Sequence, residues 1–311
     1  MLLKIPQNII VVLSFVAIVS VLFWFSLIEG TAIQFEGDYS LIHFPPQKNL
    51  EWLSITCVFL SMICAYIVFQ MNKIHRITVS NSVSFVLFTS IGFTAFLMSN
   101  ISILDLTAAL LTLISLSITL RIHNQNSVLG LLFVSSFLLG VATIFFYPSV
   151  LLLLTVLLTV AFFRPFELRN YVVILVGLTL TAFYILCFAF LFNWDLQLIE
   201  PDFSKWGSIV LAEAGTITVI IFSLVTLVAS FTMFSKRSKF IVRQRNQLVV
   251  IFIYILIQIT LSLIFCSEAL WISLVPLFSL FILYYYKSLR RKWIFDVLLM
   301  LFVFLLIWLK L

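Results

Sequence analysis

The stretch VLGLLFVSSFLLGVATIFFYPSVLLLLTVLLTVAFF, residues 128–163, carries no charged side chain and is divided near its middle by Tyr147-Pro148. A helix needs about 20 apolar residues to cross the hydrocarbon core of a bilayer, which is roughly 30 Å thick. Proline removes a backbone hydrogen bond and interrupts a helix. The stretch therefore predicts two membrane helices, Val128 to Phe146 and Val150 to Phe163, of which the second is short for a complete crossing.

The composition of the whole chain agrees with this prediction. Of its 311 residues, 63% are apolar and 10% are charged, and the mean hydropathy is +1.24. Soluble domains have roughly 45–50% apolar and 25% charged residues, so a soluble fold is excluded. The four cysteines include no CxxC pair, which excludes a disulfide scaffold and a cysteine metal site. We expect one integral membrane domain, residues 1–311, built only from α-helices.

About eleven apolar runs are long enough to be spans, which predicts a polytopic transmembrane helix bundle. Besides the two runs above, they are Ile9 to Ile28, Trp52 to Gln70, Val83 to Met98, Ile101 to Leu120, Tyr171 to Phe192, Gly215 to Phe234, Leu248 to Cys266, Leu270 to Tyr286 and Ile294 to Leu311. The first run is too long for the core of a signal peptide and lacks a small-residue cleavage site, so we expect it to be retained.

The basic residues predict the orientation of these spans. If the spans alternate, all of the 18 Lys and Arg residues except Lys48, Lys205 and Lys310 fall on one side. Lys and Arg accumulate in short cytoplasmic loops, so this side is the cytoplasm. The N-terminus is then cytoplasmic and the C-terminus periplasmic. Loops 29–51 and 193–214 lie outside, and the basic loop 235–247 lies inside.

The net charge of +6 indicates contact with anionic lipid head groups and requires no nucleic acid. The basic loop 235–247 either serves only to set the topology or binds anionic lipid or an acidic partner.

The spans themselves contain little polar chemistry. Asp105 and Glu213 lie near the outer boundary, and only Pro276 lies well inside a span. Secondary transporters use broken helices and polar groups at the membrane midplane, so an ion-coupled transporter is disfavoured. With only 8 glycines, we expect the helices to pack through Phe, Leu and Ile, with scattered Ser and Thr hydrogen bonds between helices and many Phe side chains facing lipid.

The outer loops hold the candidate functional residues. Glu36, Asp38 and His43 lie close together in loop 29–51, and Gly37 allows a turn that presents both carboxylates to one pocket. Asp105 follows a short outer loop that could meet the first one. Paired carboxylates can act as a general base and as ligands of a divalent cation. Alternatively, the acids only reflect an outer surface that has few Lys and Arg residues.

The remaining candidates are binding residues. Lys48 and Lys205 are the outer cations that could hold a pyrophosphate, and Glu213 closes loop 193–214 at the head-group level. The three histidines, His43, His75 and His123, are isolated, so neither a zinc site nor a catalytic triad can be assembled from the sequence.

Two resemblances extend the prediction. Gly130, Gly140, Tyr147-Pro148, the F-R-P-F-E-L-R sequence at 163–169 and Gly177 resemble a family of multi-pass inner-membrane proteins of Gram-negative bacteria. Members of that family have no established activity, so this resemblance implies a location in the bacterial inner membrane rather than a function.

The layout also resembles the membrane glycosyltransferases of the GT-C type, which carry acids in the first two outer loops and a glycine-containing hairpin near the middle. Glu36 and Asp38 match the first loop, Asp105 the second, and Gly130 to Pro148 the hairpin. The chain departs from that type in having a very short second outer loop and no Asp-x-Asp or Asp-x-Glu motif.

Three hypotheses follow from these observations. In the first, the chain transfers a sugar or glycan from a polyprenyl-phosphate donor at the periplasmic face, with Asp38 or Asp105 as the base and Glu36 assisting a divalent cation. In the second, it is a non-catalytic scaffold that holds other inner-membrane proteins of a secretion or envelope-assembly complex. In the third, it moves a lipid or hydrophobic solute across the bilayer.

Overall fold

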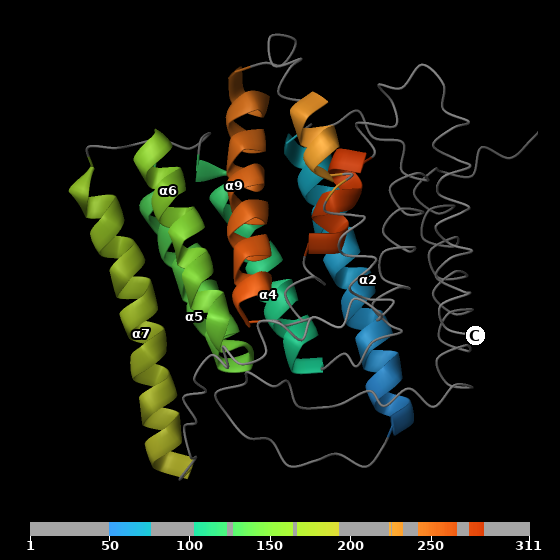
Figure 1. The fold of residues 1–311 in the computed structure, drawn as a ribbon. Coiled ribbons are helices and arrows are strands. Elements are labelled where there is room, and N and C mark those ends of the chain that lie inside the picture. Colours follow the sequence, from blue (N-terminus) through green and yellow to red (C-terminus); the bar gives the residue numbers. More distant parts are fainter. Residues whose placement is uncertain are drawn as a thin grey trace, which may run out of the picture.

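The computed structural model describes residues 50–75, 103–122, 127–163, 167–192, 224, 226–232, 242–265 and 274–282. These residues form helices joined by short turns, and there is no strand among them (Figure 1). The all-α prediction is therefore confirmed for this part of the chain. The predicted spans Ile9 to Ile28, Val83 to Met98 and Ile294 to Leu311 and the loop 193–214 lie outside it.

The described helices correspond to the predicted apolar runs. Two helices, α7 and α9, are long and apolar enough to cross a membrane, and the other apolar helices are shorter. Further helical segments lie at 226–232 and 274–282. The helices are α2 (Leu50–His75), α4 (Ile103–Thr119), α5 (Leu129–Phe145), the 3-10 helix η2 (Tyr147–Leu152), α6 (Leu153–Phe163), α7 (Leu168–Phe192) and α9 (Val242–Phe265).

Three helices extend past their predicted limits into polar sequence. Helix α7 begins at Leu168 instead of Tyr171, and α2 begins at Leu50, so residues 50–51 of the predicted outer loop are helical. Helix α9 begins at Val242, so residues 242–247 of the predicted cytoplasmic loop are helical instead. Helix α2 continues from Gln70 to His75. Hydropathy marks where a segment becomes apolar, whereas Arg, Gln and Lys are good helix formers and continue a helix beyond that point.

The predicted interruption at Tyr147-Pro148 is confirmed. Phe146 has an extended backbone, and its N–H still donates to the carbonyl of Ala142. Pro148 lies in the first turn of η2, where its missing N–H costs no helical hydrogen bond, and the Ser149 N–H donates to the Phe146 carbonyl at 3.1 Å. Since η2 leads directly into α6, the helical segment starts at Tyr147 and is longer than predicted.

The long helices run roughly side by side (Figure 1). Helices α2, α4 and α6 begin at the lower end in this view, and α5, α7 and α9 begin at the upper end. Helix α5 packs against both α4 and α7, and η2 contacts α4, α5 and α9. The ends of α4 and α6 and the start of α9 therefore lie at the upper end, and the turn between α5 and α6 lies at the lower end.

Antiparallel helices α4 and α5 are joined by hydroxyl groups. The buried Ser115 Oγ donates to the Ser135 carbonyl at 2.9 Å, and Thr119 Oγ1 and Ser135 Oγ share a hydrogen bond of 3.2 Å. The predicted Ser and Thr hydrogen bonds between helices are confirmed here. Such bonds stabilise helix pairs in lipid, where apolar surfaces gain little from meeting each other.

The parallel pair α5 and α7 packs through small residues, contrary to our prediction of packing by large apolar side chains. Gly140 faces Thr181, and Gly177 faces Ser136. A Cβ atom at Gly140 would lie 2.6 Å from Thr181 Oγ1, and a Cβ atom at Gly177 would overlap Ser136 Oγ and lie 3.0 Å from the Phe133 carbonyl oxygen. Each helix places its two small residues four positions apart, which allows close approach of the backbones.

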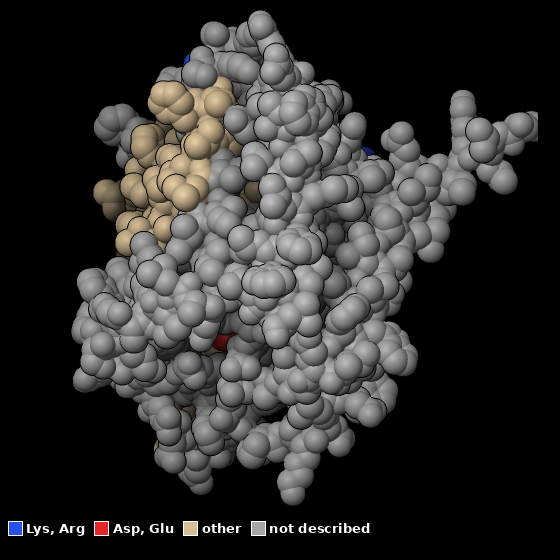
Figure 2. All heavy atoms as spheres, turned by 45° about the vertical axis from the view of Figure 1, so that its right-hand side comes forward, with Lys and Arg blue, Asp and Glu red and all other residues tan. Residues whose placement is uncertain are grey.

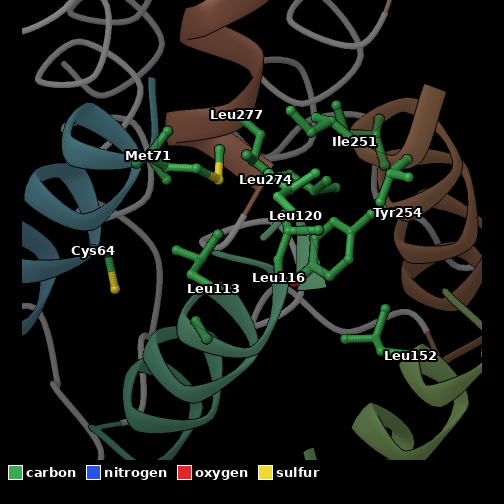
Figure 3. Close-up of a cluster of buried hydrophobic side chains, with 14 of the residues drawn as sticks. Cys64, Met71, Leu113, Leu116, Leu120, Leu152, Ile251, Tyr254, Leu274 and Leu277 are labelled. Carbon is green, nitrogen blue, oxygen red and sulfur yellow. The ribbon is translucent and has the colours of Figure 1, made fainter. Parts of the chain in front are cut away.

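The buried core is aliphatic at its centre (Figure 3). Met71 of α2 and Leu113, Leu116 and Leu120 at α4 lie near Tyr254 and Ile251 of α9. All nine residues of the segment 274–282 are buried. A helix buried on every side belongs to the interior of a large protein or bundle.

The outer surface of the described helices is apolar. Only 22% of the most apolar window of α7 is buried, and its exposed residues include Phe183 and Phe190. Phe59, Phe162, Phe188 and Phe231 are also exposed, whereas Phe146, Phe278 and Phe281 are buried. Among the described Phe side chains, the expected outward placement therefore holds for the six exposed ones, whereas three lie in the core and the others are partly buried.

The α5–α7 contact predicts a glycine-specific effect. Gly177→Ala should destabilise the protein by about 1–3 kcal/mol, because the added methyl group forces α7 away from α5. The check is thermal unfolding in a mild detergent. Gly130→Ala is the matched control, since a Cβ at Gly130 meets nothing within 4 Å. Equal melting temperatures for the two variants would contradict this packing.

Candidate functional site

Asp105 is the one predicted catalytic residue in the described part of the chain. It lies in the first turn of α4, at the lower end of the bundle in Figure 1. Its side chain is half-buried, and the Oδ1 atom is buried. A carboxylate in the first turn of a helix interacts favourably with the helix dipole.

The turn between α5 and α6 borders the same end of α4. Helix η2 contacts α4, and Ser149 of η2 is 1% exposed. The Ser149 hydroxyl finds no hydrogen-bond partner among the described residues. The lower end of the bundle thus combines a half-buried aspartate with a buried hydroxyl.

The described cations lie at the opposite end. Lys73 is in the last turn of α2, Arg121 follows α4, and Arg169 and Arg245 lie in the first turns of α7 and α9. On the face shown in Figure 2, blue Lys and Arg atoms lie in the upper part and red acidic atoms lie lower. The two ends of the bundle therefore differ in charge.

The other predicted site residues are outside the described part of the chain. They are Glu36, Asp38, His43, Lys48, Lys205 and Glu213. The expected convergence of these residues on Asp105 stays a prediction. Within the described residues, no group of three or more His, Cys, Asp and Glu side chains could hold a metal ion. The expected divalent cation is therefore also still a prediction.

Our sequence analysis missed a row of polar side chains in α9. Gln247, Tyr254 and Gln258 are each 1% exposed. Spacings of seven and four residues place them on one helix face, a signal that is present in the sequence. Polar residues buried in a membrane helix usually face the protein interior and take part in structure or function.

Gln247 has a clear structural role. Its Nε2 atom donates to the Leu120 carbonyl at 3.4 Å, across 127 positions in sequence. The last carbonyl groups of a helix lack partners within that helix, so a side chain from a neighbouring helix can satisfy them. Gln247 thus attaches the start of α9 to the end of α4.

No family model, curated protein or solved structure matches the chain. The two resemblances described above therefore rest on the residues that carry them.

The role of Gln247 predicts a local effect. Gln247→Ala should speed amide hydrogen exchange at residues 118–122 several-fold, because the Leu120 carbonyl loses its partner and the end of α4 loosens. Mass-spectrometric hydrogen exchange measures this. Asn246→Ala removes the neighbouring, only half-buried amide and should leave the exchange unchanged. Unaltered exchange in Gln247→Ala would show that α9 does not hold this end of α4.

Proposed function

We propose that the chain is a multi-pass protein of the bacterial inner membrane, with about eleven spans, a cytoplasmic N-terminus and a periplasmic C-terminus. The helix directions in Figure 1 support this topology. Each of α2, α4, α5, α6, α7 and α9 runs in the direction that strict alternation of the spans requires. The cations at the upper end support a cytoplasmic location for that end, and Asp105 then lies on the periplasmic side.

Reporter fusions test this topology. Alkaline phosphatase joined after residue 193 should be active, since the end of α7 is periplasmic in our proposal, and the same reporter joined after residue 240 should be inactive. Green fluorescent protein at the same positions should give the reverse pattern. Equal activity of the phosphatase at both positions would contradict the alternation.

We further propose that the periplasmic end transfers a sugar or glycan from a polyprenyl-phosphate donor. The observation that carries this proposal is the half-buried Asp105 at that end of α4, beside η2. A base at a helix end, on a side chain that is only half-buried, is suited to accept a proton from an incoming hydroxyl group. Glu36 and Asp38 would complete the acidic site, and a divalent cation is expected there.

The chemistry of this proposal is a substitution at the anomeric carbon. The acceptor oxygen forms a bond to this carbon as the bond to the donor phosphate oxygen breaks. The electron pair leaves with the polyprenyl phosphate, and Asp105 or Asp38 takes the proton of the acceptor. His43, Lys48, Lys205 and Glu213 are the proposed binding residues for the donor and acceptor.

A non-catalytic scaffold is the second candidate. The close contacts of α5 with α4 and α7 favour it, because they hold three helices in one arrangement that suits the binding of other inner-membrane proteins. The aliphatic side chains at the centre of the described helices give no support to the third candidate, transport of a lipid or hydrophobic solute.

Substitution of Asp105 distinguishes the glycosyltransferase from the non-catalytic scaffold. In the host bacterium, Asp105→Asn should abolish the surface glycan while protein levels stay normal, because the amide cannot act as a base. Gel electrophoresis of extracted glycans and an immunoblot provide the measurement.

Glu167→Gln is the matched control, since Glu167 is an exposed acid next to the start of α7, at the other end of the bundle. It should leave the glycan intact. Wild-type glycans in Asp105→Asn, together with stoichiometric co-purifying proteins, would favour the scaffold.

A further inference from the structure

We draw no further inference here: the strongest candidate, the exposed face of α7 that carries Phe183, Leu186 and Phe190, is an apolar surface, and nothing in the described part of the structure shows what covers it.

Discussion

The packing of α5 between α4 and α7 is the contact on which the described structure depends most. Two neighbouring serines of α5 contact different helices, one contacting α4 and the other contacting α7. Ser135 is joined to Ser115 and Thr119 of α4 by hydrogen bonds, and Ser136, with Gly140, lies against Gly177 and Thr181 of α7. Lipid competes equally well for apolar surface, so close backbone approach and hydrogen bonds provide the preference for one helix arrangement.

This arrangement has consequences at both ends of the bundle. At one end, the turn through Phe146 and Pro148 places η2 in contact with α4, whose first turn carries Asp105 at that end of the bundle. At the other end, Gln247 connects α9 to the end of α4. The end that carries Asp105 and the connection to α9 therefore both depend on α4, which packs against α5.

The two ends of the bundle also carry different chemical groups. The carboxylate proposed to act in catalysis lies at one end, and the described Lys and Arg side chains lie at the other. The core between them is filled by side chains such as Leu113, Leu116 and Tyr254 (Figure 3). A densely packed interior is hard to compress or rearrange. Such packing suits a molecule that holds the groups at its two ends in fixed positions.

The sequence by itself determined the helical class, the position of most apolar helices and the turn at Tyr147-Pro148, because hydropathy and proline act locally along the chain. It did not determine where α9 begins, since Arg and Gln continue a helix without being apolar. Only the tertiary structure decided that Gly140 and Gly177 are contact points and that Gln247 reaches Leu120. These pairings join residues far apart in sequence, and they depend on which helix faces meet, which the hydropathy of one segment does not specify.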